Sequence, residues 1–332
     1  MLVECRLPAY DRPDLLDRAL RSLLAQTHRE WVAIVMDDSR TQSGRAVVEA
    51  IGDPRIRYKQ NTERLGSTGN LNQAFGPLPL AAGEFAFILE DDNAVTPDFM
   101  ASALRRAAES RLNVISLNQK CVLADGKGGF VVQEGAWRSE DADAVWSNER
   151  LVLSTFLKPG LPNGAYFWRC NTVDLRVDER IREPMLQESA RQLRVGGNIL
   201  LAKEACSLWS ALPPNLVRRD VVKNRVFLLT RDLFAAAVLK CVPAKTVLRW
   251  GKAKLDAAQL QMLRDRLGGV ALFRAQLLPL FANNPRGACK GLVRYLLYRS
   301  HLPPDLCVLL QDQSEKLFGS KDREEGKPAK SQ

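Results

Sequence analysis

The chain has 332 residues, of which 46% are hydrophobic and 26% are charged, and its formal net charge is +10 at pH 7. This composition is ordinary for a folded globular protein and excludes a chain that is disordered throughout. The seven cysteines form no CxxC pair, which favours reduced thiols over a disulfide framework or a zinc site, so any metal is expected to be held by oxygen.

The first hundred residues alternate between strand and helix patterns. The run at 31–36 is apolar without a break, as expected for a strand buried on both faces of a parallel sheet. Repeated strand-helix-strand units predict an α/β fold with a mostly parallel central sheet. The expected strands are 3–7, 31–36, 56–59 and 85–89, and the expected helices are 13–26, 43–51, 67–75 and 98–110.

Beyond residue 110 the pattern changes twice. A strand at 113–117 and a glycine-rich, hairpin-like stretch at 122–132 predict a mixed β region that completes the first domain. After about residue 205 we expect helices, interrupted by proline and glycine, at 221–242, 245–267, 270–281 and 288–298. The predicted organisation is an α/β domain over 1–210, a basic helical region over 211–303, and a C-terminal segment over 304–332 with a disordered tail.

Basic residues concentrate between positions 217 and 298, where sixteen Lys and Arg stand against four acidic residues, a net charge of +12. This indicates an anionic partner such as a membrane surface, a lipid-linked phosphate or nucleic acid. The charges are spread over four predicted helices without a known binding motif, so nucleic acid is not expected. Ordinary packing of amphipathic helices against the sheet is weighed above peripheral contact with an anionic membrane.

Two features bear on location. The sequence does not open with a basic segment followed by a long apolar run, so a secretory signal is not expected. Apolar stretches in the helical region are shorter than the roughly 20 residues that span a bilayer. We therefore expect a cytoplasmic protein, with peripheral contact at the inner face of the membrane as an open alternative.

Acidic residues directly follow two of the predicted strands. Asp37 and Asp38 follow one, and Glu90, Asp91 and Asp92 follow the other. Open α/β sheets bind ligands in the crevice outside the carboxyl ends of their strands. Paired carboxylates beside a nucleotide diphosphate require a hard cation such as Mg²⁺ or Mn²⁺ between them, and this cation stabilises the leaving diphosphate.

Several segments around these residues resemble the signature of family 2 glycosyltransferases, which have the GT-A fold. Ala9 replaces the usual Thr, Asp11 replaces Asn, and the Gly after Asp38 is missing, but order and spacing are kept. The Asp-Asp-Asn form, with Pro97 five residues after Asp92, resembles that of the spore-coat polysaccharide members in particular. The segments are Pro-Ala-Tyr-Asp-Arg-Pro at 8–13, Leu-Leu-Ala-Gln-Thr at 23–27, Val-Ala-Ile-Val-Met-Asp-Asp-Ser at 32–39, and the blocks at 61–66, 71–75, 82–85 and 88–97.

The resemblance implies a donor site for a nucleotide-sugar. Asp92 would coordinate the metal, with Asp91 and Glu90 assisting and Asp91 also near the ribose. Asp38 would accept a hydrogen bond from N3–H of uracil or thymine, which favours a UDP- or dTDP-sugar, and Tyr10 could stack on the base. The remaining expected donor-binding residues are Pro8, Arg12, Arg64 and Asn72.

The resemblance further implies an inverting transfer, in which a base takes the proton of the acceptor hydroxyl. Glu188 is the first candidate for this base, with Glu183 and Asp178 behind it. Trp168 is the candidate platform for the acceptor, although core packing is the commoner explanation of such aromatics. The expected acceptor is a polysaccharide, a glycolipid or another cell-envelope saccharide.

Two other interpretations remain open at this point. A nucleotidylyltransferase could share the sheet and the metal-binding carboxylates, but it is expected to carry a glycine-rich basic loop after its first strand, where this chain offers only Arg12. Alternatively, a degenerate GT-A domain could act as a binding module through its basic helical half.

Overall fold

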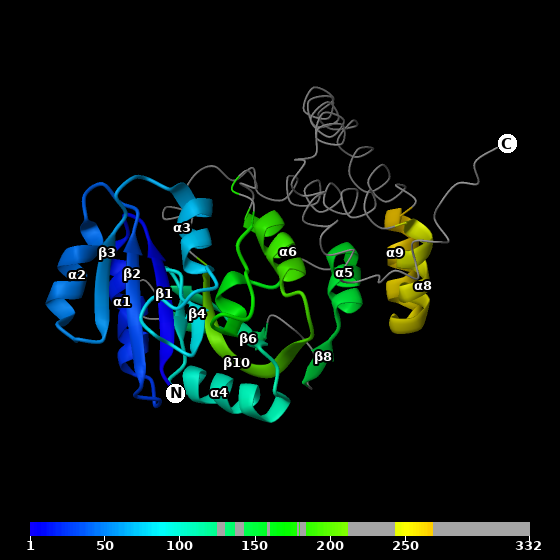
Figure 1. The fold of residues 1–332 in the computed structure, drawn as a ribbon, viewed down its shortest axis with the longest axis horizontal. Coiled ribbons are helices and arrows are strands. Elements are labelled where there is room, and N and C mark those ends of the chain that lie inside the picture. Colours follow the sequence, from blue (N-terminus) through cyan, green and yellow to red (C-terminus); the bar gives the residue numbers. More distant parts are fainter. Residues whose placement is uncertain are drawn as a thin grey trace, which may run out of the picture. The chain divides into compact units, whose positions relative to one another are not determined.

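The computed structural model of the protein describes residues 1–124, 130–136, 143–157, 160–177, 179, 184–211 and 243–267 (Figure 1). These residues belong to two compact units. The first unit draws on Met1–Trp146, Leu161–Glu179 and Gly197–Val221, and the second draws on Ser147–Gly160, Arg180–Gly196 and Val222–Gln332. The central sheet lies in the first unit.

The first unit is built around one sheet. Its described strands run in the order β3-β2-β1-β4-β9-β6-β10-β5, with β7 beside β6 and β8 beside β10. Strands β3, β2, β1 and β4 are parallel, as are β6 and β10, whereas β9 pairs antiparallel with both β4 and β6. The predicted α/β fold with a mostly parallel central sheet is confirmed. The bounds are β1 Val3–Ala9, β2 Trp31–Asp37, β3 Ile56–Gln60, β4 Phe85–Ile88, β5 Ala94–Val95, β6 Val114–Ala124, β7 Phe130–Ala136, β8 Ala144–Trp146, β9 Tyr166–Arg169 and β10 Ile199–Ala211.

Strand β1 sorts its side chains between the two faces of the sheet, because successive residues of a strand point to opposite faces. Val3, Cys5 and Leu7 enter the hydrophobic core. Glu4 and Arg6 alternate with them and are also fully buried. A guanidinium nitrogen of Arg6 lies 3.0 Å from a carboxylate oxygen of Glu4. Two opposite charges are thus buried on the face that is turned away from the core.

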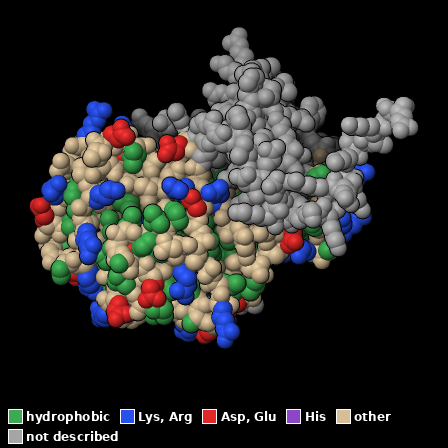
Figure 2. All heavy atoms as spheres, in the orientation of Figure 1, with side chains coloured by type: hydrophobic (Ala, Val, Ile, Leu, Met, Phe, Trp, Pro, Cys, Tyr) green, Lys and Arg blue, Asp and Glu red, His purple; other side chains and the backbone are tan. Residues whose placement is uncertain are grey.

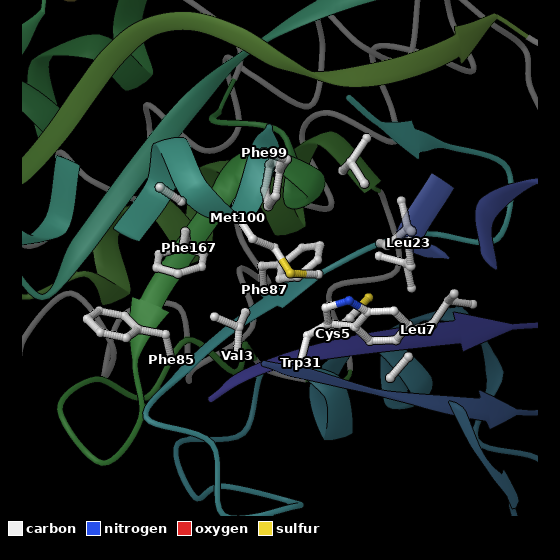
Figure 3. Packing of buried hydrophobic residues seen from close by; sticks show 14 of the residues in the cluster. Val3, Cys5, Leu7, Leu23, Trp31, Phe85, Phe87, Phe99, Met100 and Phe167 are labelled. Atoms are coloured by element: carbon white, nitrogen blue, oxygen red, sulfur yellow. The ribbon is translucent and has the colours of Figure 1, made fainter. Parts of the chain in front are cut away.

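The core lies between the sheet and helices α1 (Pro13–Leu24) and α4 (Phe99–Ser110). Proline at the first position of α1 has a fixed φ that suits helix initiation. Figure 3 shows Phe99 and Met100 of α4 above Phe87 of β4, and the rings of Phe87 and Phe99 are 4.7 Å apart. The side chains that α1 buries are spaced at helical intervals: Leu16, Ala19, Leu20 and Leu23.

The buried Glu4–Arg6 pair fixes the chain between α3 (Gly66–Ala74) and β4. Arg6 donates to backbone carbonyl oxygens and Glu4 accepts from backbone N–H groups, so backbone hydrogen bonds satisfy both buried charged groups. Buried ion pairs are tolerated when such additional hydrogen bonds complete them. The pair therefore anchors residues 74–83. The carbonyl oxygens belong to Ala74, Gly76 and Leu78, and the N–H groups to Leu80, Ala81 and Gly83.

Two predictions about the second half of the chain are wrong in detail. Strand β10 runs to Ala211, into the region expected to be helical, because it pairs with β6 over much of its length. The single helix expected at 245–267 is two helices, α8 (Ala244–Lys254) and α9 (Ala257–Leu267). Asp256 separates them and accepts the Gln259 N–H at 2.8 Å, which caps α9.

Other predictions have mixed outcomes. The hairpin expected at 122–132 is confirmed, since β6 and β7 pair antiparallel. The helices expected at 221–242, 270–281 and 288–298 lie outside the described residues. The second unit also contains α5 (Asn148–Leu157) and α6 (Pro184–Arg194).

Within the described ranges, every helix is too short or too polar to cross a membrane. On the described surface in Figure 2, basic and acidic side chains are interspersed.

Candidate active site

A pocket of about 290 Å³ lies at the carboxyl ends of β1, β2 and β4, beside the first turn of α3. Parallel strands bring their carboxyl ends to one edge of the sheet, which is where open α/β sheets bind ligands. Every donor- or metal-binding residue predicted from the sequence lines this pocket except Asn72, while their roles remain predictions. The lining residues are Pro8, Ala9, Tyr10, Arg12, Asp38, Arg64, Gly66, Ser67, Asn70, Leu71, Glu90, Asp91 and Asp92.

The adjacent aspartates at the end of β2 have different environments. Asp37 is fully buried and points at the start of α2 (Ser43–Ile51), where it accepts the Gly44 N–H at 3.0 Å. A β-carbon at position 44 would lie 2.9 Å from Asp37 Oδ2, so this close approach needs glycine. Asp37 also accepts the Ser39 N–H and the Tyr58 hydroxyl, each at 2.9 Å. Asp37 therefore has a structural role, while Asp38 faces the pocket.

Asp38 joins the pocket to the loop before α3. Its Oδ1 accepts the Asn61 side-chain amide at 2.9 Å and the Leu65 N–H at 2.8 Å, and its Oδ2 accepts the Gly66 N–H at 2.9 Å. The residue is only 4% exposed. An ionised carboxylate offers about four lone-pair sites. These hydrogen bonds occupy three of them, which leaves Oδ2 with capacity for a ligand in the pocket.

The acidic turn after β4, formed by Glu90, Asp91 and Asp92, is contacted by the loop that follows β1. The Tyr10 N–H donates to Asp91 Oδ2 at 3.0 Å. The Arg12 guanidinium nitrogen Nη1 lies 3.3 Å from Asp91 Oδ1 and also donates to Asp92 Oδ2. The two carboxylates therefore converge on one cationic atom. This convergence arises because β1 and β4 are neighbours in the sheet.

Strand β10 and helix α1 support the acidic turn from outside the pocket. Arg18 Nη2 donates to the carbonyl oxygen of Asp92 at 2.9 Å and to Ser210 Oγ at 3.2 Å. The Ser210 N–H donates to Asn93 Oδ1 at 3.0 Å, and Asn93 Nδ2 donates to Glu90 Oε2 at 3.0 Å. Burial lowers the pKa of Arg18, and the nearby Asp92 opposes this shift. Sequence reasoning missed Arg18 because its partners come from distant parts of the chain.

The loop between β1 and α1 needs an unusual backbone conformation. Asp11 has φ +49°, in the left-handed region that Asn and Asp tolerate better than other side chains. Its Oδ1 accepts the Thr41 hydroxyl at 3.0 Å, which ties this loop to the segment after β2. The Arg64 guanidinium lies 4.8 Å from the centre of the Tyr10 ring. One face of the predicted base-stacking ring is thus covered by a cation.

The prediction that Asn72 binds the donor is not supported by its position. Its side-chain amide donates to the Val177 carbonyl at 2.6 Å, and its carbonyl oxygen accepts the Val177 N–H at 3.0 Å. Asn70 lines the pocket instead and donates to the Met36 carbonyl at 3.1 Å. The pocket-lining residues of α3, at 66, 67, 70 and 71, share one helical face. That helical phase was the sequence signal that would have favoured Asn70 over Asn72.

Trp168 belongs to the core. Its side chain is fully buried, it stacks on Phe75 with ring centres 5.5 Å apart, and the Arg6 guanidinium lies 5.5 Å from its ring centre. An acceptor sugar would need an exposed ring face. The structure therefore assigns Trp168 to packing and not to acceptor binding.

The predicted catalytic bases lie in another part of the chain. Glu188 is a half-buried residue of α6, in the second unit. Glu183 and Asp178 lie outside the described residues. A catalytic role for any of the three stays a prediction.

The carboxylates of the acidic turn suit a divalent cation that a ligand helps to coordinate. The described residues contain no group of three or more His, Cys, Asp or Glu side chains placed to hold a metal by themselves. However, oxygens of Asp91 and Asp92 converge on one cationic nitrogen, so the same oxygens could share a metal ion. Mg²⁺ commonly uses one or two protein carboxylates together with substrate phosphates and water. The oxygen donors present fit this pattern.

The fold resembles that of a protein of known structure. The crystal structure of S. aureus TarS 1-349 in complex with UDP-GlcNAc aligns with 95% of this chain and 88% of that chain, with a TM-score of 0.57. Sequence identity in this alignment is 16%, so the likeness establishes the fold alone.

Two curated relatives match at the sequence level. The GalNAc(5)-diNAcBac-PP-undecaprenol beta-1,3-glucosyltransferase of Campylobacter jejuni is 26% identical over 153 residues, which are 45% of this chain and 47% of that protein. The succinoglycan biosynthesis protein ExoO of Rhizobium meliloti is 31% identical over 119 residues, 36% of this chain and 33% of ExoO. This chain thus aligns with a third to a half of their lengths. Residues 6–139 match the family described as glycosyl transferase family 2, so this segment of the chain is similar to that family.

Proposed function

We propose that the protein is an inverting glycosyltransferase that moves a sugar from a UDP- or dTDP-sugar to a saccharide or lipid-linked acceptor of the cell envelope. One observation carries the proposal: Asp38 and the Asp91–Asp92 pair, from two different strand ends, line one pocket of a family 2 domain. The names of the relatives, a glucosyltransferase acting on a lipid-linked diphosphate and a succinoglycan biosynthesis protein, support the acceptor class.

The base would bind at the Asp38 end of the pocket. Asp38 Oδ2 retains capacity to accept one more hydrogen bond, and N3–H of uracil or thymine is a suitable donor. Tyr10 would stack on the base with one face of its ring. Arg64 would either stay on the opposite face of the ring or be displaced by the base. Asn70 and Ser67 of α3 would border the sugar–phosphate part of the donor.

The diphosphate would lie at the acidic end of the pocket. A divalent cation, Mg²⁺ or Mn²⁺, held by Asp91 and Asp92 would neutralise charge on the leaving diphosphate when bound. Glu90 is turned toward Asn93, which gives it a supporting part in shaping the turn. Arg12 supplies positive charge at the same end of the pocket.

Glu188 is our proposed general base for the acceptor hydroxyl. Glu188→Gln keeps the size of the side chain and removes its basicity, so nucleotide binding should persist while transfer falls by about 10²–10⁴-fold. Single-turnover release of UDP from a UDP-sugar, with and without an acceptor glycan mixture, measures this. Unchanged acceptor-dependent release in Glu188→Gln would assign the base elsewhere.

The proposed lipid-linked acceptor implies work at a membrane surface. In α8, Lys245, Arg249 and Lys252 are exposed at intervals of four and three residues, which places them on one helical face. Such a basic stripe would bind anionic headgroups, each charge contributing about 1 kcal/mol near the surface. Co-sedimentation with phosphatidylglycerol vesicles should decrease when all three are changed to Gln. Equal sedimentation with neutral and anionic vesicles would remove this part of the proposal.

Nucleotide binding is the direct test of the enzyme proposal. Isothermal titration with UDP, dTDP and GDP, each with and without Mn²⁺, should show metal-dependent binding of UDP or dTDP in preference to GDP. Asp92→Asn should abolish the metal dependence. Asp53→Asn is the matched control, because Asp53 pairs with Arg55 and does not line the pocket. Absence of metal-dependent binding, or an Asp92→Asn variant that behaves like the control, would reject the proposal.

A further inference from the structure

Arg12 occupies the place that a metal ion would take in the proposed donor site. Its Nη1 lies 3.3 Å from Asp91 Oδ1 and donates to Asp92 Oδ2. The side chains involved are mostly buried, at 19% exposure for Arg12, 10% for Asp91 and 23% for Asp92. Salt screens such partly buried pairs less than exposed ones.

A guanidinium and a divalent cation compete for these carboxylate oxygens. Both bind through positive charge. A metal ion bound to the same oxygens would lie close to Arg12 Nη1, and the two positive charges would repel each other strongly. A free metal ion must therefore displace Arg12 without any compensating contact for the displaced guanidinium. A metal ion that arrives with a diphosphate brings such a contact, because Arg binds phosphate oxygens in a bidentate manner.

The pocket can release Arg12 without losing its shape. The Tyr10 N–H holds Asp91 through Oδ2, the oxygen that does not contact Arg12. Arg18 holds the acidic turn through the carbonyl oxygen of Asp92, which leaves the Asp92 carboxylate out of that contact. Arg12 directly precedes α1 and makes no side-chain cap on the helix. Movement of its side chain therefore leaves the Asp91 carboxylate and the backbone of the acidic turn in place.

We propose that Arg12 is a positioning residue that holds Asp91 and Asp92 in the donor-free protein and transfers to the diphosphate when the donor binds. It thereby excludes free metal and couples metal binding to nucleotide binding. This inference rests on the proposed function, since it assumes a nucleotide diphosphate as the ligand. It adds a specific order: the metal enters with the nucleotide or after it.

The test uses Mn²⁺ alone as a probe. The electron paramagnetic resonance signal of free aqueous Mn²⁺ measures how much of the ion is unbound, so it reports binding without any enzymatic turnover. Wild-type protein should bind Mn²⁺ alone weakly and bind it more tightly once UDP is present. Arg12→Gln should bind Mn²⁺ alone at least about tenfold more tightly than wild type, and should bind UDP with Mn²⁺ about tenfold less tightly. Arg12→Lys keeps the charge, so its affinity for Mn²⁺ alone should stay close to that of wild type.

Arg64→Gln is the matched control, because it removes one charge from the same pocket while Arg64 stacks on Tyr10. Its affinity for Mn²⁺ alone should change by less than about threefold. Equal affinities of wild type and Arg12→Gln for Mn²⁺ alone would overturn the inference, and UDP-enhanced Mn²⁺ binding in both would then leave the proposed function standing. If UDP failed to enhance Mn²⁺ binding by the wild type, the proposed function and this inference would fall together. Thermal melts of each variant check that it is folded.

Discussion

Replacing Asp38 by Asn tests whether this residue reads the nucleotide base. Asp38 uses both oxygens to hold Asn61, Leu65 and Gly66 and keeps one acceptor site toward the pocket. In Asp38→Asn the amide oxygen can still accept from Asn61 and Leu65. The amide nitrogen then faces the Gly66 N–H, donor against donor, and its second hydrogen points into the pocket.

The expected effects follow from this exchange of an acceptor for a donor. Loss of the hydrogen bond from Gly66 should lower the free energy of unfolding by about 1–3 kcal/mol. In the pocket, N3–H of uracil loses its acceptor, whereas N3 of cytosine, an acceptor, gains a donor. A change of about 1–3 kcal/mol corresponds to a decrease of about 5- to 150-fold in the preference for UDP over CDP.

Isothermal titration of wild type and Asp38→Asn with UDP and CDP, in the presence of Mn²⁺, measures the preference, and urea unfolding measures the stability. Asp37→Asn is the control, because Asp37 also accepts backbone N–H groups but points at α2. It should lose stability without changing the ratio of the two affinities. An unchanged ratio in a folded Asp38→Asn protein would refute the assignment of Asp38 to the base.

Three further predictions concern stability. Arg6→Met should lower the free energy of unfolding, measured in urea, by about 3–5 kcal/mol. Adding Glu4→Gln should not restore the stability, because both side chains also hydrogen-bond to backbone groups of residues 74–83, and full restoration would contradict this account. Trp168→Ala should lower the free energy of unfolding by about 3–5 kcal/mol, while the affinity of the remaining folded protein for UDP stays the same. Loss of UDP binding without loss of stability would show that Trp168 contributes to the site. The Thr96 hydroxyl is the main cause that lowers the pKa of Asp98 from 3.8, so the stability that Asp98 contributes is present above about pH 4 and is lost as the pH falls further. Asp98→Asn should therefore reduce the acid sensitivity of the melting temperature, and parallel curves for the two proteins would show that the interaction is negligible.

The fold of the first hundred residues could be predicted because its signals are local. The unbroken apolar run at 31–36 and the helical spacing from Leu16 to Leu23 each identify an element without knowledge of the rest. Strand β10 could not be recognised in this way. It holds Lys203 and Glu204 within its span, and its place in the sheet depends on β6, a strand far earlier in the chain.

The same distinction applies to the site. Asp38 and Asp92 follow predicted strands, so their position at the sheet edge could be expected. The structure places Asn72 off the pocket lining and Trp168 in the core, because a residue type near a motif does not reveal which face of its element it occupies. The contact of Arg12 with Asp91 was invisible in the sequence, since it depends on β4 lying next to β1.

Strand β9 sets a limit on how this protein can be divided. The segment that matches the family ends at residue 139, yet β9 lies between β4 and β6, both of which belong to that segment. Ser210, still further along, donates to Asn93 beside the acidic turn. A chain that stopped at residue 139 would have two exposed strand edges in the middle of its sheet and a weakened acidic turn. We therefore expect that the segment matching the family does not fold by itself, and that truncated or fused proteins need the chain at least through β10.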